Sequence, residues 1–416
     1  MAETEAPHAH DLGAAAGGVA PEDSARLRWQ TPCKPVELSI EVAESVDALL
    51  ALRGDYERLQ VSSGNSLPFA LHEWHVAWCN HFLTENRRIQ SRIFIHVLRD
   101  GTGRCVAIVP LIRTRRVIGP FRITSLDLLG ADPAITEIRS ALIEPGFEAC
   151  VARAVQHKLT AQGGYNWIQW HGTAGLFWQT LTAGAVMQRQ EPLVDYVLDL
   201  PASWEGFRAL LKRNVRESIR HCYNSLRRDG HQFEFTVAQR PEDVQSALER
   251  FFVLHAARAK LPGAVKHPDH FQIEVSRRFL RDVTQRLSQR GIVRLFELKI
   301  GAEVVASRIG FVVGDSLYLY YSGYDPRWSK YSVMTTTVVE AIKHAIAAGL
   351  ATVNLTPGTD VSKTRWSPRE LELPQAVQVY PSQLSRWAWN LYQQARSPAR
   401  KRPFGLFSLH SKRRWS

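Results

Sequence analysis

The stretch from residue 293 to residue 355 constrains the fold most strongly, because its apolar pattern changes from a strand period to a helix period and back. Gly301 and Gly314 supply turn residues between apolar runs, and Gly349 is the residue type favoured just past a helix end. Strands are expected at 293–300, 304–313, 316–322 and 352–355, with a helix at 333–348. Three strands, a helix and a strand in this order indicate a mixed α/β layer.

The other periodic segments extend this pattern towards both ends of the chain. In the first part, strands are expected at 38–42, 91–98, 105–114, 167–170 and 196–200, and helices at 47–58, 70–82 and 147–162. In the second part, helices are expected at 204–211, 213–228, 241–259 and 273–289, and a strand at 233–237. Both parts share the order helices, hairpin, helix, strand, which indicates an internal duplication without evident sequence identity.

The length of 416 residues favours two domains. Residues 1–34 are rich in Ala, Gly, Pro and Glu and are predicted to be disordered. The sequence predicts a first domain at 35–200, a second at 201–388, and a flexible basic tail at 389–416. The expected fold class is α/β, with two tandem domains built on mixed sheets flanked by helices.

The net charge, the apolar stretches and the N-terminal sequence indicate which partners and which location to expect. A formal net charge of +12 favours anionic partners, such as phosphates, nucleic acid or acidic lipid, without selecting among them. No apolar stretch approaches the roughly 20 residues that span a bilayer, and the N-terminus lacks the basic and apolar regions of a signal peptide. We therefore expect a cytoplasmic protein.

The five cysteines are odd in number and form no CxxC pair. They are expected to be reduced, mostly buried thiols, and no metal site is expected. The sequence also contains no GxSxG, HExxH or Walker loop, so the corresponding hydrolase, zinc-protease and nucleotidase chemistries lack support. Trp74 and Trp78, four residues apart on the helix at 70–82, are expected to lie in the core.

Three segments resemble a known family, the CelD-type group of GNAT acyltransferases, which is linked to bacterial exopolysaccharide synthesis and akin to the Fem-type aminoacyl transferases. They are LHEWHVAWCNHF (71–82), LKRNVRESIRHCYNSLRRDG (211–230), and the pair GAEVVASRIGFVVGDSLYLYYSGYDPRWSKYS (301–332) and NLTPGTDVSKTRW (354–366). The resemblance spans roughly residues 40–385. It implies two GNAT-like domains and transfer of an acyl group from acyl-CoA, with no permanently bound cofactor.

The resemblance implies that the loop before the helix at 333–348 holds the pyrophosphate of the acyl-CoA. The residues expected there are Lys330, Tyr331, Ser332 and Val333, whose amides lie at the positive end of the helix. Ser332 is also expected to be the N-cap of that helix, and a cap and an anion site use the same donors. The family usually has Pro-Gly where this chain has Val333-Met334, which also permits a degenerate domain.

Asp360 and Lys363 follow the strand at 352–355, after a Pro-Gly turn, where ligands bind in α/β layers. Asp360 is expected to orient or deprotonate the acceptor amine, and Lys363 to stabilise developing negative charge. The alternative is a surface ion pair that contributes little.

Three further residues are candidates on the acceptor side. Tyr324, at a strand end, is expected to donate a proton to the leaving thiolate, or else to be a packing residue. His255 and Arg258 lie three residues apart on one helix face, so His255 is a candidate base and Arg258 a candidate substrate ligand. The alternative for His255 is a structural role.

The run from Lys212 to Arg228 holds six basic residues and one acid. Arg213, Arg216 and Arg220 fall near one helical face and are expected to bind a phosphate-bearing substrate, such as a nucleotide-linked sugar or tRNA. A solvated charged helix face is the alternative.

The sequence thus predicts an acyltransferase that moves an acyl group, such as acetyl, from CoA to an amine acceptor, for example an amino sugar, in envelope polysaccharide assembly. Two alternatives stay open: a Fem-like transferase that uses aminoacyl-tRNA, and a non-catalytic GNAT scaffold beside a polysaccharide synthase. DNA is not an expected partner, and membrane contact is expected only through the basic tail.

Overall fold

The computed structural model describes residues 37–131, 134–171, 176–183, 187–261 and 267–396. The predicted disordered segment 1–34 and the part of the basic tail after residue 396 lie outside these ranges. No helix in the described ranges is long and apolar enough to cross a membrane.

The first half of the chain alternates helices and strands as the pattern predicts, with the additional elements η1, β4, β5 and α5. Its elements are β1 (Ser39–Ala43), α1 (Val46–Ala51), α2 (Arg53–Ser62), the 3-10 helix η1 (Pro68–Ala70), α3 (His72–Phe82), β2 (Ile89–Arg99), β3 (Cys105–Ile118), β4 (Phe121–Leu128), β5 (Leu142–Ile143), α4 (Glu148–Gln162), β6 (Trp167–His171), α5 (Leu176–Ala183) and β7 (Met187–Asp199).

The second half contains the expected three strands, helix and strand, followed by elements that the pattern did not predict. Its elements are α6 (Trp204–Leu210), α7 (Arg213–Arg228), β8 (Phe233–Ala238), α8 (Pro241–Ala259), α9 (Glu274–Ser288), β9 (Val293–Ile300), β10 (Glu303–Val313), β11 (Ser316–Tyr324), the 3-10 helix η2 (Pro326–Tyr331), α10 (Val333–Ala347), β12 (Thr352–Asn354), α11 (Val361–Thr364), β13 (Arg369–Val379) and α12 (Gln383–Arg396).

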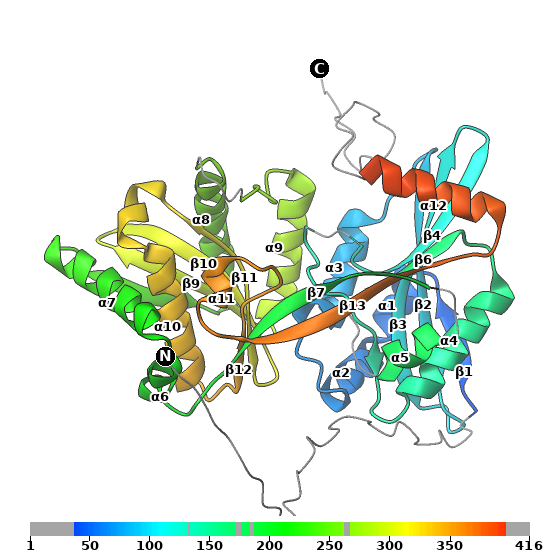
Figure 1. The fold of residues 1–416 in the computed structure, drawn as a ribbon, viewed down its shortest axis with the longest axis horizontal. Coiled ribbons are helices and arrows are strands. Elements are labelled where there is room, and N and C mark those ends of the chain that lie inside the picture. Colours follow the sequence, from blue (N-terminus) through cyan, green and yellow to red (C-terminus); the bar gives the residue numbers. More distant parts are fainter. Residues whose placement is uncertain (1–36, 132–133, 172–175, 184–186, 262–266, 397–416) are drawn as a thin grey trace, which may run out of the picture. The chain divides into compact units, whose positions relative to one another are not determined.

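One mixed sheet runs through both halves, and its order is symmetric (Figure 1). The order is β1-β2-β3-β4-β6-β13-β7-β12-β11-β10-β9-β8, and β5 pairs with β3 outside this path. Read inward from either edge, three antiparallel pairs are followed by one parallel pair, β4 with β6 and β11 with β12. The internal duplication that the element order indicates is therefore present in the topology.

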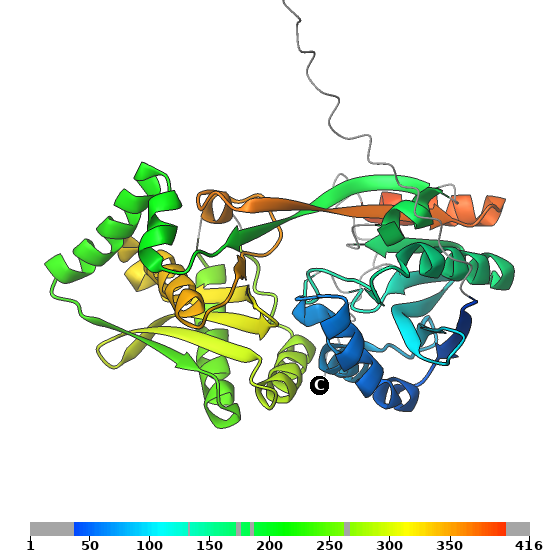
Figure 2. The ribbon, with the colours of Figure 1, turned by 90° about the horizontal axis from the view of Figure 1, so that it is seen from below.

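The two central strands are exchanged between the halves. β7 ends the first half but pairs with β12 of the second, whereas β13 ends the second half but pairs with β6 of the first. Figures 1 and 2 both show β7 and β13 side by side, and they pair antiparallel along most of their length. The expected boundary at residues 388 and 389 falls inside α12, which packs beside β13 and β6 through Trp389 and Trp167.

Prolines explain why most of β7 and all of β13 escaped prediction. Pro192 lies in β7 and Pro374 in β13, and proline is unfavourable inside a central strand because it lacks the N–H donor. The pairing shifts register between Leu373 and Gln375, opposite the segment that contains Pro192. Both prolines therefore sit at an irregularity where ladder hydrogen bonds are already interrupted.

The second-half sheet separates two hydrophobic layers. Alternation along β11 sends Tyr318 and Tyr320 to a core shared with α3, α8 and α9, and sends Leu317 and Leu319 to a core shared with α7 and α10. Trp74, as expected, is fully buried, with its ring 5.2 Å from that of Phe279 on α9. Trp78 is buried as well.

The cysteine expectation is confirmed in part. Cys79, Cys105 and Cys222 are free, buried thiols. Cys150 is disulfide-bonded, so the expectation of reduced thiols was wrong for this residue. Cys33 lies outside the described residues.

Gly323 allows helix α8 to pack directly on β11. A Cβ at this position would meet backbone atoms of Leu254 and His255, with the Cα of His255 at 2.7 Å. We predict that Gly323→Ala lowers the free energy of unfolding by about 1–3 kcal/mol, because helix and strand must separate. Urea unfolding measures the change. Gly54→Ala is the control, since no atom lies near a Cβ there and alanine is the better helix former; equal loss in both variants would contradict the prediction.

Candidate active site

The carboxyl-terminal part of β11 has an open edge. β11 pairs with β12 only at its first three residues, Ser316, Leu317 and Tyr318, because β12 ends at Asn354. In the strands described here, residues 319–324 have no partner on that side. In the first half the parallel pair of β4 and β6 lies near the end of β4, at residues 125–127, so no comparable edge follows it.

The loop that leaves this open edge leads into the amino end of α10. Asp325 caps η2 by accepting the amide of Arg327 at 2.9 Å. Ser332 then adopts a left-handed conformation, with φ of 52°, and its carbonyl accepts the amide of Thr335 at 2.8 Å. Ser332 does occupy the N-cap position, but its side chain accepts no helix amide, so the expected side-chain cap is absent. The left-handed backbone turns the chain there without a glycine.

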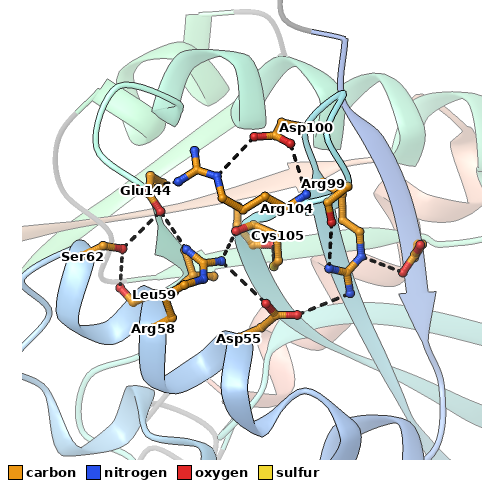
Figure 3. Close-up of polar contacts among 12 residues, drawn as sticks. Asp55, Arg58, Leu59, Ser62, Arg99, Asp100, Arg104, Cys105 and Glu144 are labelled. Carbon is orange, nitrogen blue, oxygen red and sulfur yellow. Dashed lines mark hydrogen bonds and ion pairs between the residues drawn. The ribbon is translucent and has the colours of Figure 1, made fainter.

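The two halves differ in charge at the equivalent helix ends. The first turn of α10 contains no acidic residue. At α4, Glu148 accepts the amide of Gly146 at 2.8 Å, and Glu144 bonds to Arg58 at 3.0 Å and to Arg104 at 3.3 Å (Figure 3). Carboxylates thus lie at the amino end of α4, whereas the first turn of α10 contains none.

The four residues predicted to bind CoA play different parts in this loop. Tyr331 is buried, and its hydroxyl donates to Asp229 at 2.9 Å. The side chain of Val333 is buried too, so only its amide is a candidate donor. The side chain of Lys330 is 69% exposed, with its ammonium 3.8 Å from Asp229. Lys330 is therefore an exposed cation beside the loop, with Asp229 and the ring of Tyr331 as its neighbours.

Asp360 and Lys363 are brought together beside the open edge. Asp360 caps α11 by accepting the amide of Ser362 at 3.0 Å, and the Lys363 ammonium lies 3.4 Å from it and donates to the carbonyl of Pro357. Burial lowers the pKa of Lys363, against the opposing effect of Asp360. Burial alone raises the pKa of Asp360, but the hydrogen bond from Ser362 and the charge of Lys363 outweigh it and lower the pKa.

Glu137, which the sequence analysis did not single out, reaches this cluster from the first half. It lies between β4 and β5 and accepts the hydroxyl of Tyr318 on β11 at 2.7 Å. Its pKa is raised to about 7: burial raises it most and the charge of Asp195 adds to the rise, whereas the bond from Tyr318 and the charges of Lys363 and Arg308 oppose it.

Tyrosines of β11 hold the loop that carries Glu137. Tyr320 donates to the carbonyl of Ile135 at 2.5 Å, and Tyr321 donates to that of Ala134 at 2.7 Å. Thr136 accepts the indole N–H of Trp74 at 3.0 Å. The one sequence signal for this contact is the tyrosine run in β11, because polar hydroxyls on a buried strand need partners. The run does not say which partner, 181 positions away, it meets.

The hydrogen-bonded pair of Asn354 and Asp195, together with Arg308, completes the cluster. Asn354 donates to Asp195 on β7 at 2.6 Å, and burial raises the pKa of that aspartate. Arg308 on β10 donates to the carbonyl of Leu319, the first residue of the open edge, at 3.1 Å. Burial lowers the pKa of Arg308 to about 10.

His255 and Arg258 fix α8 against the same edge. His255 is 5% exposed, and its Nδ1 donates to the carbonyl of Ser322 at 2.9 Å. Its ring packs against Phe251, Phe271 and Tyr321, and its Nε2 lies 3.8 Å from a carboxylate oxygen of Asp269. Arg258 donates to the hydroxyl of Ser322 at 2.8 Å and lies 5.9 Å from the ring centre of Tyr324. Tyr324 and Arg258 therefore adjoin each other at the end of β11.

The predicted substrate-binding arginines are divided between two places. Arg258 lies at the open edge, whereas Arg213, Arg216 and Arg220 line a separate groove of about 630 Å³ between α6, α7 and α10. This groove also contains Trp204, Arg208, Tyr223 and Lys343. Tyr223 donates to Glu340, and the Lys343 ammonium lies 5.2 Å from the ring centre of Trp204.

No group of three or more His, Cys, Asp or Glu residues in the described ranges is arranged to hold a metal ion.

Residues 213–364 match the sequence model of a protein family described as "Acetyltransferase (GNAT) domain". No curated protein is significantly similar to this chain in sequence. The described fold is similar to the crystal structure of FemX, with a TM-score of 0.55, 10% identity, and coverage of 82% of this chain and 98% of that chain. That similarity supports the tandem GNAT fold and not a shared substrate.

Two other solved structures show lower similarity. L-PGS from Bacillus licheniformis matches with a TM-score of 0.49 and 12% identity, covering 82% of this chain and 96% of that chain. A conserved protein of unknown function from Bacteroides thetaiotaomicron matches with a TM-score of 0.48 and 12% identity, covering 82% of this chain and 100% of that chain.

The raised pKa of Glu137 predicts a pH-dependent cost in stability. Its pKa rises from about 4.5 to about 7 on folding, so the free energy of unfolding falls as the pH rises between these values. We expect Glu137→Gln to be more stable than the wild type at pH 8, by on the order of 1–3 kcal/mol, and equally stable at pH 4.5. Urea unfolding at both pH values checks this. A wild type more stable than the variant at pH 8 would contradict the assignment.

Proposed function

We propose that this chain, through its GNAT acetyltransferase domain at residues 213–364, transfers an acyl group from acyl-CoA to an amine. The observation that carries the proposal is the open edge of β11, which leads directly to a helix end free of acidic side chains. The extended arm of an acyl-CoA contains two amides. The backbone groups of residues 319–324 that are not bonded to Arg308 or His255 offer hydrogen bonds of the kind that add a strand to a sheet.

The diphosphate of the donor then lies at the amino end of α10. In the described chain, the amides of Val333 and Met334 make no hydrogen bond to other protein groups, and amides at a helix end bind anions. Lys330 adds a cation beside them. The absence of the Pro-Gly pair does not remove the turn, because Ser332 provides the left-handed residue.

The acyl carbon lies among the charged groups near Asp360 and Lys363. Lys363 stabilises the negative charge that develops on the carbonyl oxygen, because its ammonium is mostly buried and its field is weakly screened. Asp360 orients Lys363 and caps α11. Tyr324 protonates the leaving thiolate from the end of the open edge, beside Arg258.

For the acceptor we propose an amino sugar or a similar amine of exopolysaccharide or cell-envelope assembly, with the reaction on the cytoplasmic side. This part rests on the resemblance of residues 71–82, 211–230, 301–332 and 354–366 to the CelD-type group. The charged groups near Lys363 suit a polar acceptor.

Calorimetric titration with acetyl-CoA tests the donor. We expect saturable binding to the wild type, weakened about 3–30-fold by Lys330→Ala, because loss of one exposed cation near a diphosphate costs roughly 0.5–2 kcal/mol. Lys158→Ala, an equal charge change on α4, is the control and should bind like the wild type. Absence of binding at millimolar acetyl-CoA would overturn the acyl-CoA donor.

The basic groove favours a second candidate, a Fem-like transferase that takes its acyl group from aminoacyl-tRNA. The groove is lined by five basic residues and one acid. Arg213 is paired with Glu217 at 2.7 Å, whereas Arg208, Arg216 and Arg220 have no acidic partner in the part of the chain described. Unpaired arginines beside the aromatic rings of Trp204 and Tyr223 suit a phosphate backbone with exposed bases.

Fluorescence anisotropy with total tRNA over a range of salt concentrations separates the two donors. For the tRNA donor, binding weakens steeply with salt, and the Arg216→Ala/Arg220→Ala variant reduces the slope of log K against log [salt] by about two. The Arg87→Ala/Arg88→Ala variant removes the same charge elsewhere and should keep the wild-type slope. If tRNA binds weakly and the groove substitutions do not change its affinity or salt dependence, the tRNA donor is ruled out. If neither acetyl-CoA nor tRNA binds, the scaffold alternative is supported.

A further inference from the structure

We propose that the first half of the chain supplies the general base for the site in the second half, and that this base is Glu137. The inference rests on the proposed acyltransferase function and adds the group that takes the proton from the acceptor amine. Glu137 is held by its bond to Tyr318 at 2.7 Å, and Tyr318 is the last β11 residue paired with β12. The carboxylate therefore lies at the tip of the Tyr318 side chain, close enough to Lys363, Asp195 and Arg308 for their charges to affect it.

The anchoring of the loop fixes the position of this carboxylate. Hydroxyls of Tyr320 and Tyr321 bond to the residues just before Glu137, at Ile135 and Ala134. Gly130 permits the close packing of the loop, because a Cβ there would lie 2.7 Å from the methyl group of Thr136. A base must be held within hydrogen-bond reach of the proton that it abstracts, and a loop anchored at Ala134, Ile135 and Glu137 holds the carboxylate in one place.

Groups on four neighbouring elements change the pKa of Glu137. Tyr318 on β11, Lys363 on α11 and Arg308 on β10 favour the ionised carboxylate, whereas Asp195 on β7 and burial favour the protonated form. Their balance leaves the pKa near 7, so the group both accepts and releases a proton at neutral pH. A general base works best when its pKa is close to the pH of the reaction.

A purely structural role does not account for Glu137. A glutamine accepts the same hydroxyl of Tyr318 without burying a charge, so the carboxylate lowers stability at neutral pH for no gain in packing. Groups that are unfavourable for stability but well positioned are characteristic of functional sites.

The proposed reaction moves the acyl group from the thioester sulfur to the amine nitrogen. The acceptor ammonium gives one proton to the Glu137 carboxylate, and the nitrogen lone pair then forms the C–N bond at the thioester carbonyl. The C–S bond breaks with its electron pair on sulfur, and the second amine proton passes to the thiolate through Tyr324. Glu137 returns its proton to solvent, so the products are an amide, a CoA thiol and one proton. Tyr318 is a positioning residue, because it acts through Glu137.

Release of CoA thiol from acetyl-CoA, with glucosamine as the probe amine, tests the assignment in full-length protein. We expect Glu137→Gln to lower kcat by about 10²–10⁴-fold while calorimetric binding of acetyl-CoA stays within about threefold of wild type. Glu148→Gln, an equal change at α4 in the first half, is the control and should keep its activity. A Glu137→Gln variant with kcat near that of the wild type overturns the proposal.

The pH dependence of kcat/KM distinguishes a base from a residue that only supports the site. The part to compare is the fall in kcat/KM at low pH, the acid limb, where a general base becomes protonated. Tyr318→Phe removes a bond that lowers the pKa of Glu137 and should move the limb to higher pH. Asp195→Asn removes a charge that raises that pKa and should move the limb to lower pH. Shifts in these opposite directions support Glu137, whereas an unmoved limb in both variants excludes it.

A second measurement does not depend on the acceptor. In protein labelled with ¹³C at glutamate carboxyl groups, the resonance missing from Glu137→Gln should titrate near pH 7, and bound acetyl-CoA should shift that titration. A titration unchanged by bound acetyl-CoA overturns the base and leaves the donor intact. Failure of acetyl-CoA to bind overturns the proposed acyl-CoA function instead, so the two failures are separable.

Discussion

The exchange of β7 and β13 is the constraint on which the rest of the structure depends. Neither half completes its sheet with its own last strand, since β7 pairs with β12 and β13 pairs with β6. The backbone hydrogen bonds of two long strands therefore join the halves, and a buried strand without them leaves polar groups unpaired. β12, the neighbour of β7, has only three residues, and the open edge of β11 follows from that shortness.

The duplicated halves have diverged in the chemistry of their helix ends. At α4 the first half holds Glu144 and Glu148 beside basic partners of its own. At α10 the second half has a left-handed Ser332 and no acid in the first turn. One topology thus yields two different helix ends, and a loop of the first half places Glu137 against β11 of the second half.

Local pattern predicted most elements because it depends on neighbours in sequence. The strands and helix from 293 to 355 and the burial of Trp74 follow from the apolar period alone. β13 escaped because Pro374 contradicts a central strand until the bulge that accommodates it is known. Asp360 and Lys363 were predicted as site residues because they follow a strand, and the structure adds the ion pair between them. For His255 the structure adds the surrounding aromatic rings and the nearby Asp269.

The sequence by itself determined most of the order of elements, the α/β class and the basic character of α7, since these follow from periodicity and composition. Only the tertiary structure decided that Glu137 meets Tyr318, that β7 and β13 change places, and that Ser332 turns the backbone without capping the helix with its side chain. The physical reason is that such contacts join residues far apart in the chain. Their partners are selected by packing and hydrogen-bond satisfaction across the whole fold, and no local pattern records that selection.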